Sequence, residues 1–278
     1  MFQQFMQKTS QNPSHLAERR DQGNQSKPLI FKKQIIRRVA REKLKAKNEF
    51  VLICMKQAWT EVLLFLTRGI NFRYRQNEAA RNAYAKMALT EFESINARQQ
   101  WTNWRTIPQN LTGRITLRPM KAIDLCCGTG HSTEVLAHYL PSGSEILGLE
   151  FSEEFLRVAR KREYIDQSGA PVRVEFNAQS VLELFCDADG NIVPDHSVDL
   201  VNSCGAVGCH FDQEKTLVLA IEVARVVKSG GLAMIDSGAP GTNRNQLVKI
   251  FESKGFQFIH STRSCFFDRY TQVCFKKR

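Results

Sequence analysis

The stretch Lys121-Ala122-Ile123-Asp124-Leu125-Cys126-Cys127-Gly128-Thr129-Gly130-His131-Ser132-Thr133 decides the fold of this chain. Its apolar first half predicts a short buried strand, its two glycines predict a tight turn, and the residues after Gly130 predict the start of a helix. A strand, a turn and a helix in this order place backbone N–H groups and a helix N-terminus around a bound ligand. The stretch therefore predicts a ligand-binding turn in an α/β domain.

After this turn, predicted strands and helices alternate, which is typical of a parallel sheet with crossover helices. Strands are expected over residues 122–126, 145–150, 172–176, 198–202 and 232–236, with two closing strands over 256–261 and 270–275. Helices are expected over residues 131–140, 153–162, 212–227 and 246–254. Ser152 is the expected N-cap of the second helix, and Gly230-Gly231 is expected to close the third in a left-handed glycine cap.

Before the turn, the sequence divides into two parts. Residues 1–28, which are rich in Gln, Asn and Ser, predict a disordered polar tail, and residues 29–115 predict a helical region ahead of the ligand-binding domain, residues 116–278. Within the helical region, the apolar run from Phe50 to Leu66 predicts a buried helix that stops at Gly69. Lys56 and Glu61 interrupt this run too soon for a membrane span, so no transmembrane helix is expected.

A further helix is expected from Glu78 to Trp104, ending before Pro108 because proline lacks the backbone donor that a helix needs. Large apolar residues of this helix, most of them aromatic or Met, recur at helical spacing, and they are Tyr84, Met87, Phe92, Ile95, Trp101 and Trp104. Such a stripe favours packing in a core. Because the helix directly precedes the first strand, it also predicts a lid over the ligand site.

The net charge of +11 is unevenly distributed. Between Lys27 and Lys47 there are nine Lys or Arg residues and one acid, Glu42, so this segment carries +8 and the rest of the chain is nearly balanced. Apolar residues recur at helical spacing between Leu29 and Ala46, which predicts a basic amphipathic helix. Such a helix can lie on an anionic membrane, contact nucleic-acid phosphates, or pack on the domain with a solvated basic face.

The eight cysteines occur without a Cys-x-x-Cys pair, and several fall in predicted strands. This pattern argues against a disulfide framework and a zinc site, and it favours a reducing, cytoplasmic setting. The polar tail has no apolar core segment, which argues against a secretory signal. The acidic run from Asp187 to Asn191 is interpreted as a surface turn, because no twelve-residue calcium loop ending in Glu follows it. We therefore expect no metal.

Three residues separate this turn from the glycine turns of dinucleotide-dependent oxidoreductases. Those enzymes place a third glycine three residues after the second, where this chain has Thr133. Asp124, four residues before Gly128, cannot help to bind a pyrophosphate, but it can fix the loop and neutralise an ammonium group. Glu150, at the end of the second predicted strand, lies where a carboxylate accepts hydrogen bonds from ribose hydroxyls. Together they predict a cationic cofactor that carries an amino acid.

Over residues 121–277 the chain resembles the class I S-adenosylmethionine-dependent methyltransferases. Residues 123–130 resemble the family's first motif, and Leu149-Glu150-Phe151-Ser152 resembles its strand-two acid followed by a helix cap. Three further matches follow in order at residues 199–203, 225–231 and 254–256. The resemblance implies an α/β fold with a doubly wound, mainly parallel, seven-stranded Rossmann-like sheet, an antiparallel last strand and a preceding helical region.

The resemblance also implies S-adenosyl-L-methionine as the cofactor and a direct, in-line transfer of its methyl group, which depends on alignment and on exclusion of water. Gln179 or Ser180 stands where the family often has an Asp that reads adenine, and the ring of Tyr84 can steady a sulfonium. The expected cofactor-binding residues are Asp124, Cys126, Gly128, Thr129, Gly130, Glu150, Phe151, Gln179, Ser180, Asn202 and Tyr84.

The loop after the fourth predicted strand, residues 203–210, faces the methyl group in this family. His210 is the candidate general base, although a structural histidine is the simpler interpretation. Cys204 resembles the nucleophile of cytosine carbon-5 RNA methyltransferases, but Ser203 stands where those enzymes have proline, so a small buried thiol is favoured.

Three functions follow from these expectations. The leading hypothesis is a cytoplasmic methyltransferase for a small-molecule or lipid-like acceptor, with the N-terminal helices as the acceptor lid and peripheral contact with an anionic membrane as one use of Lys27–Lys47. The alternative is an RNA methyltransferase that uses Lys27–Lys47 as a phosphate-binding arm. The third is a non-catalytic module that binds S-adenosylmethionine.

Overall fold

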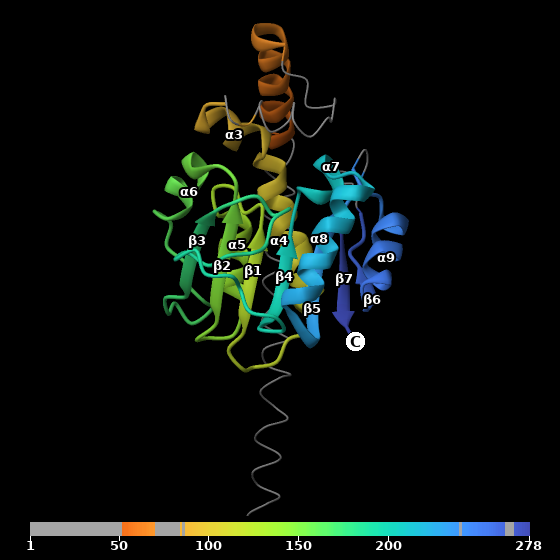
Figure 1. Cartoon of the computed structure of the whole chain (residues 1–278). Helices are drawn as coiled ribbons and strands as arrows, with labels where there is room; N and C mark the ends of the chain where they lie inside the picture. Colours follow the sequence, from red (N-terminus) through yellow and green to blue (C-terminus); the bar gives the residue numbers. More distant parts are fainter. Residues whose placement is uncertain (1–51, 70–83, 85–86, 239–240, 265–269) are drawn as a thin grey trace, which may run out of the picture.

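The computed structural model describes residues 52–69, 84, 87–238, 241–264 and 270–278. These residues form a seven-stranded sheet with helices on both of its faces (Figure 1). The predicted polar tail and the predicted basic helix over residues 29–46 lie outside the described residues, as do residues 78–83 of the third predicted helix.

The sheet has the strand order β3-β2-β1-β4-β5-β7-β6. All neighbouring pairs from β3 to β5 are parallel, whereas β7 runs antiparallel to both β5 and β6. The predicted mainly parallel sheet with an antiparallel last strand is therefore confirmed. The strands are β1 (Lys121–Leu125), β2 (Glu145–Glu150), β3 (Arg173–Ala178), β4 (Val198–Ser203), β5 (Val227–Ser237), β6 (Phe256–Ser261) and β7 (Thr271–Lys277).

Two apolar cores cover the two faces of the sheet, as in a doubly wound fold. One core packs α4 (Ala97–Leu111), α5 (His131–Tyr139) and α6 (Glu153–Ala159) against one face. The other packs α8 (Gln213–Val226) and α9 (Arg244–Ser253) against the opposite face. The order of β1 and β4 in the centre places the carboxyl ends of the parallel strands at one edge, which is where such folds bind ligands.

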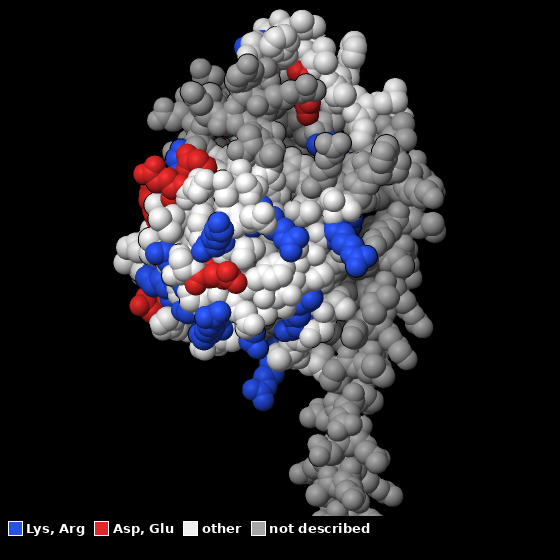
Figure 2. All heavy atoms as spheres, turned by 90° about the vertical axis from the view of Figure 1, so that its right-hand side faces the viewer, with Lys and Arg blue, Asp and Glu red and all other residues white. Residues whose placement is uncertain are grey.

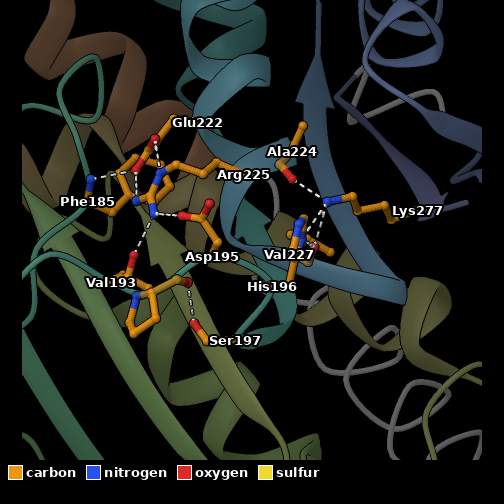
Figure 3. Close-up of polar contacts among 11 residues, drawn as sticks. Phe185, Val193, Asp195, His196, Ser197, Glu222, Ala224, Arg225, Val227 and Lys277 are labelled. Carbon is orange, nitrogen blue, oxygen red and sulfur yellow. Dashed lines mark hydrogen bonds and ion pairs between the residues drawn. The ribbon is translucent and has the colours of Figure 1, made fainter.

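The predicted glycine cap of the helix after β4 is wrong. Helix α8 ends at Val226, its C-cap Val227 is extended, and β5 begins there and runs through Gly230 and Gly231. The last carbonyls of α8 are met instead by a side chain from the end of β7, because Lys277 Nζ donates to the carbonyls of Ala224 and Val227 (Figure 3). A cation at a helix C-terminus also complements the helix dipole.

Beside this cap, Arg225 ties α8 to the loop that leads into β4. Its guanidinium donates to the carbonyl of Val193 at 2.7 Å, to Asp195 at 2.7 Å and to both oxygens of Glu222 at 2.5 and 2.8 Å (Figure 3). Glu222 in turn accepts from the backbone N–H of Phe185 at 2.7 Å. These bonds raise the pKa of the Arg225 guanidinium above its ordinary value, with the Glu222 hydrogen bond as the main cause.

The helix that was predicted to end before Pro108 differs from the prediction in its bounds. The chain breaks at Asn96 between α3 (Leu89–Ile95) and α4, and Pro108 lies inside α4. Ile107 and Leu111, on either side of the proline, are both fully buried against the sheet. Burial of these two side chains offsets the cost of the missing backbone donor, because proline's penalty of about 3 kcal/mol is comparable to the gain from two buried apolar side chains.

The helix over residues 52–68 follows the prediction in its position but not in its burial. It ends at Gly69, whose φ of 66° is left-handed, as expected for a C-terminal glycine. However, it projects away from the sheet (Figure 1), and among its large apolar side chains Leu64 is buried whereas Leu52, Trp59 and Leu66 are more than two thirds exposed. The expectation of a buried helix is therefore wrong.

Positive charge gathers in a second place besides Lys27–Lys47. Residues 244–278, which form α9, β6 and β7, carry eight Lys or Arg and two acids. Figure 2 views the molecule from this side, and blue side chains clearly outnumber red ones on the face that is not grey. The interpretation that the basicity belongs to one element of the chain is therefore corrected.

Candidate functional site

The glycine turn between β1 and α5 is the centre of the site. Gly128 and Gly130 have φ angles of 55° and 85°, which explains why glycine stands at both positions. Cys126 is also left-handed, with a φ of 53°. The backbone of Cys127 donates to the carbonyl of Leu149 at 3.1 Å, so the turn is attached to the end of β2.

Asp124 lies beneath this turn and is completely buried. One of its oxygens accepts from Ser132 at 2.7 Å and from Thr133 at 2.6 Å, and the other accepts from Asn202 at 2.7 Å. Burial raises the pKa of Asp124, and these three hydrogen bonds oppose that shift. Asp124 thus fixes the start of α5, which is the first of the two roles expected of it, and its carboxylate does not line the cavity described below.

A line of buried side-chain amides continues from Asp124 to the N-terminal region. Asn202, which donates to Asp124, accepts from Gln272 Nε2 at 2.8 Å, and Gln272 Oε1 accepts from Asn110 Nδ2 at 2.9 Å. All four side chains are fully buried. The bonds join α4, β7, β4 and β1 to the glycine turn, so the floor of the site is one hydrogen-bonded unit.

Glu150 closes the turn from the end of β2. Its carboxylate accepts from the backbone N–H of Gly128 at 3.0 Å and from that of Ser152 at 3.1 Å. The side chain is 4% exposed, and burial raises its pKa to about 7, against the hydrogen bonds that favour the ionised form. Each carboxylate oxygen has a second lone pair, so Glu150 can still accept hydrogen bonds from a ligand.

A cavity of about 360 Å³ opens over the turn. This volume falls within the range of about 300–1,000 Å³ that small-molecule sites occupy. Its lining combines the glycine turn, the ends of β2 and β3, the loop after β4 and the N-terminal helices. Of the expected cofactor-binding residues, eight line it: Tyr84, Cys126, Gly128, Thr129, Glu150, Phe151, Gln179 and Ser180. Asp124, Gly130 and Asn202 lie behind the lining and support it.

Aromatic side chains from the N-terminal helices cover one side of this cavity. Phe92 of α3 stacks on Phe155 of α6, with ring centroids 3.9 Å apart, and its edge lies where a β-carbon on Gly128 would be 3.3 Å away. Tyr84 contacts Phe92 edge to face at 5.8 Å. These two residues of the aromatic stripe therefore line the cavity, while Trp104 packs against α5 in the core.

The loop after β4 forms the opposite side and folds into a short helix, α7 (Val207–His210). The buried carboxylate of Asp236 holds it in place, because it accepts from Ser203 Oγ at 2.8 Å and from the backbone N–H of Gly208 at 2.8 Å. His210 Nε2 and the hydroxyl of Tyr84 are 3.2 Å apart, so they form a hydrogen bond across the cavity. This contact joins the candidate base to the lid.

The geometry matches a known family. A family model described as a methyltransferase domain matches residues 118–265, which is more than half of the chain. The chain belongs to the S-adenosylmethionine-dependent methyltransferases. The cofactor of this methyltransferase is therefore S-adenosylmethionine, as the resemblance of the motifs implied.

Known proteins similar to this methyltransferase include quinone-modifying enzymes. Demethylmenaquinone methyltransferase of Staphylococcus aureus is 29% identical over 116 residues, which are 41% of this chain and 42% of that protein. A 2-phytyl-1,4-naphtoquinone methyltransferase of Thermosynechococcus vestitus is 35% identical over 65 residues, 23% of this chain and 25% of that protein. The chain thus spans less than half of the length of these two relatives.

A solved structure confirms the fold. Magnesium protoporphyrin IX methyltransferase of Synechocystis PCC 6803, with bound S-adenosylmethionine, superposes with a TM-score of 0.50 at 15% identity, covering 80% of this chain and 97% of that one. At this level of identity the likeness shows the fold alone.

The lining residues of the methyltransferase fit the cofactor. The hydroxyl of Thr129 is buried against the cavity and has no hydrogen-bond partner among the described residues, so it is available to a ligand. Glu150 also lines the cavity, and its contact with the ribose hydroxyls stays a prediction. The absence of a side chain on Gly128 lets a ligand approach the turn closely, because Phe92 is the only described residue beyond the adjoining chain within 4 Å of the place where a β-carbon would lie.

Gln179 does not offer its amide to adenine in the way that was expected. Its carbonyl oxygen accepts from Asn177 Nδ2 at 2.9 Å and from the backbone N–H of Cys186 at 2.8 Å, and its Nε2 donates to the carbonyl of Leu184 at 3.1 Å. The side chain therefore shapes the loop after β3. Ser180 also lines the cavity, and its Oγ accepts one local hydrogen bond, from the backbone N–H of Leu182 at 3.3 Å.

Several lining residues were not predicted. Gln99 and Asn103 lie four residues apart on α4, and Gln99 Nε2 donates to Asn103 at 2.9 Å and to Cys204 Sγ at 3.2 Å. Their spacing on one helix face next to the aromatic stripe was the available signal. Arg162, which is not part of the lining, was also missed: it donates to the carbonyl of Thr129 at 2.5 Å and contacts His131 at 2.8 Å. Burial lowers the pKa of His131 to about 4, and the charge of Arg162 adds to this shift.

Proposed function

We propose that this chain transfers the methyl group of S-adenosylmethionine to a small, apolar aromatic acceptor that carries an ionisable hydroxyl, as a quinol does. The observation that carries the proposal is the hydrogen-bonded Tyr84–His210 pair, which lines the same cavity as Glu150 and the glycine turn. The names of the relatives from Staphylococcus aureus and Thermosynechococcus vestitus support this class of acceptor.

The cavity has two ends with different chemistry. The glycine turn, Thr129 and Glu150 make the end for the cofactor. We assign Tyr84, His210 and Phe211, which also line the cavity, to the acceptor end, and most of the lining surface of the whole cavity is apolar although it includes Lys215. An apolar aromatic acceptor fits this second end, because burying its ring there needs no charged partner.

His210 is the proposed general base. The bound cofactor supplies an electrophilic methyl group, and an acceptor hydroxyl becomes a better nucleophile, or activates its ring, when it loses its proton. His210 lies at the acceptor end with Nε2 directed at the Tyr84 hydroxyl, so an acceptor hydroxyl that replaces or joins Tyr84 in this contact can pass its proton to the imidazole. Tyr84 orients the ring in the absence of the acceptor.

The lid supplies the exclusion of water. Phe92 and Phe155 stack over the glycine turn, and Asp236 fixes α7 on the opposite side. Both sides are therefore preorganised around the position of transfer, which is the main contribution that this class of reaction requires. We further propose that residues 29–115 act as the acceptor lid and that residues 116–278 form the cofactor-binding domain.

Contact with RNA through Lys27–Lys47 is the alternative. This segment lies outside the described residues, and the named relatives give no support for a nucleic-acid acceptor. Cys204, the residue that would act in a cytosine carbon-5 enzyme, accepts a hydrogen bond from Gln99 at the cavity wall. Its position fits a packing role as well as contact with an acceptor.

A labelled methyl donor tests the proposal. Purified protein would be incubated with S-adenosylmethionine carrying a labelled methyl group and either a short-chain naphthoquinol or total RNA. We expect label in the quinol and none in RNA. Label in RNA, or cofactor binding with no transfer to the quinol, would overturn the proposal. Glu150→Ala should abolish transfer by removing cofactor binding, whereas Glu154→Ala, a neighbouring exposed acid on α6, should leave it unchanged.

A further inference from the structure

We propose that the helix over residues 52–68 lies on the surface of an anionic phospholipid bilayer, with its outward apolar face among the lipids, and that it delivers a lipid-dissolved acceptor to the cavity. The first half concerns the surface of the protein alone. The second half rests on the proposed function.

This helix is amphipathic, but its polar side faces the protein and its apolar side faces outward. Its inward side carries Gln57, Thr60 and Glu61, of which Thr60 hydrogen-bonds to Ser94 of α3 at 2.7 Å and Gln57 donates to Glu61 at 2.8 Å. Leu64 is the one large apolar side chain that this side buries in the described structure, against Met87 and Ile95. A helix that packs on a protein core normally turns its apolar side inward.

The outward side holds the apolar residues instead. Seven large apolar side chains on this helix are between 48% and 74% exposed: Leu52, Met55, Trp59, Val62, Leu63, Phe65 and Leu66. Five of them, at positions 52, 55, 59, 62 and 66, follow alternating steps of three and four residues and so form one continuous stripe. An exposed apolar surface of this extent marks an interaction site.

The charges near this face favour an anionic surface as the occupant. The exposed side chains of the helix include Lys56 and no acid, and Arg68 at its end pairs with Glu91 at 2.9 Å. The segment Lys27–Lys47, which is separated from the helix by four residues that include one acid, Glu49, carries +8. Apolar residues that include Trp and Phe, next to basic residues, are the composition of helices that lie in the interface of anionic membranes.

A second copy of this chain fits the face less well. A parallel pair of these helices would bring two segments of charge +8 together, and their repulsion opposes such a pairing. The proposal concerns contact with the membrane surface, because no helix in the described part of the chain is long and apolar enough to span a bilayer. The stripe therefore fits contact with the membrane surface.

The position of the helix connects this surface to the cavity. Its inward residue Leu64 packs in a small cluster with Met87 and Ile95, and Tyr84 and Phe92 pack against the same cluster. Tyr84 and Phe92 also line the cavity. A bilayer under the outward face would thus lie one helix away from the lid, which is where an apolar acceptor leaves the lipid.

Vesicle flotation tests the first half of the proposal without methyl transfer. Full-length protein would be floated with phosphatidylcholine vesicles, either pure or with about a third of phosphatidylglycerol, an anionic lipid. We expect flotation with the anionic vesicles, weakening as salt rises. The double variant Trp59→Gln and Leu66→Gln should bind the anionic vesicles at least about tenfold more weakly, because two apolar side chains no longer enter the lipid. Flotation that is equal with pure phosphatidylcholine, or unchanged in the double variant, would overturn the proposal.

A matched control removes an exposed apolar side chain elsewhere. Ile221 on α8 is 52% exposed, and Ile221→Gln should float like the unchanged protein. All variants should keep the same binding of S-adenosylmethionine, which shows that they fold. If sedimentation instead reveals a dimer that the double variant abolishes, without flotation, then a second copy covers the face and the proposal is wrong.

The second half is tested by the same pair of variants with two acceptors. With a quinol dissolved in anionic vesicles, the double variant should lose transfer at least in proportion to its flotation. With a water-soluble quinol, it should retain full transfer. If flotation is seen but neither quinol is methylated, the proposed function fails while the membrane contact stands. If both quinols are methylated equally by the double variant, delivery from the membrane is excluded.

Discussion

The carboxylate of Glu150 accepts a hydrogen bond from the backbone N–H of Gly128 over 3.0 Å, so the end of β2 holds the glycine turn in its left-handed conformation. The same carboxylate is the group expected to bind the cofactor ribose. One buried side chain therefore has two tasks, and burial raises its pKa to about 7. Its state of protonation then governs both the turn and the ligand.

The affinity for S-adenosylmethionine should depend on pH through Glu150. Ribose hydroxyls donate to the ionised carboxylate, so binding should be strongest above about pH 7 and fall by up to about tenfold per pH unit below it. The free energy of unfolding of the unliganded protein should change with pH in the opposite direction. Because the pKa of Glu150 is raised from 4.5, the stability that this group contributes is present below pH 4.5 and is lost as the pH rises through about 7. Calorimetric titration across this range measures the first effect.

The matched variant for this prediction is Glu150→Gln. The amide does not titrate, so its cofactor affinity should be lower by about 1.5–3 kcal/mol at high pH and should not change with pH. A pH dependence that persists in Glu150→Gln would show that another group is responsible.

Gly128→Ala and Gly169→Ala should have similar effects on folding but different effects on binding. Both glycines have positive φ angles, 55° and 84°, so each alanine should lower the free energy of unfolding by about 1–2 kcal/mol. A β-carbon at Gly128 lies 3.3 Å from Phe92 at the cavity, whereas none of the described atoms lies within 4 Å of one at Gly169. Only Gly128→Ala should therefore weaken cofactor binding. Thermal unfolding with and without cofactor measures both quantities.

Cys126→Gly should stabilise the fold. Cys126 adopts a φ of 53°, which is costly for a residue with a side chain, so glycine should raise the free energy of unfolding by about 0.5–1 kcal/mol. Cys127→Gly is the control, because Cys127 is buried and has no positive φ, and it should destabilise. Chemical denaturation measures the free energy of unfolding of both variants. Equal destabilisation of the two would contradict backbone strain at Cys126.

His210→Gln should lower methyl transfer by about 10²–10⁴-fold while cofactor affinity stays the same, as expected for loss of a general base. Tyr84→Phe removes the hydrogen bond of 3.2 Å but keeps the ring, so it should have a smaller effect and should change the pH profile of transfer. Single-turnover rates with the quinol measure both. Equal rates for His210→Gln and the unchanged enzyme would leave His210 as a structural residue.

Arg225→Gln should destabilise the protein without affecting the site. The change leaves the carboxylate of Glu222, which is 7% exposed, without its cation, and about 2–4 kcal/mol of unfolding free energy should be lost. Arg157→Gln, on the exposed side of α6, should cost less than about 0.5 kcal/mol. Cofactor affinity measured on both variants should be unchanged.

The positions of the strands could be predicted from the sequence, because local alternation and the spacing of turns decide them. The seven-stranded sheet with an antiparallel last strand was implied by the family resemblance. β2 and β6 have the predicted bounds, and Ser152 caps α6 as expected. The end of α8 could not be predicted, since Lys277, which satisfies its last carbonyls, is some fifty residues further along the chain. The continuation of α4 through Pro108 likewise depends on burial against strands that follow it.

The candidate site shows the same division. The positions of Glu150, Gly128 and Thr129 at the cavity follow from motif spacing. The bonds that engage Gln179 depend on how the loop after β3 folds back, which spacing does not show. The direction of the apolar side of residues 52–68 was also beyond the sequence, because hydropathy gives the amount of apolar surface and says nothing of the side that a helix turns outward.

The line of buried amides from Asn110 through Gln272 and Asn202 to Asp124 has an evolutionary consequence. The amide nitrogens of Asn110, Gln272 and Asn202 each donate to an oxygen of the next residue, so the line has a fixed direction that ends at the carboxylate of Asp124. A single replacement would leave a buried donor or acceptor of a neighbouring residue unmatched. In related sequences these four positions should therefore change together or not at all, although Asn110 and Gln272 are 162 residues apart along the chain.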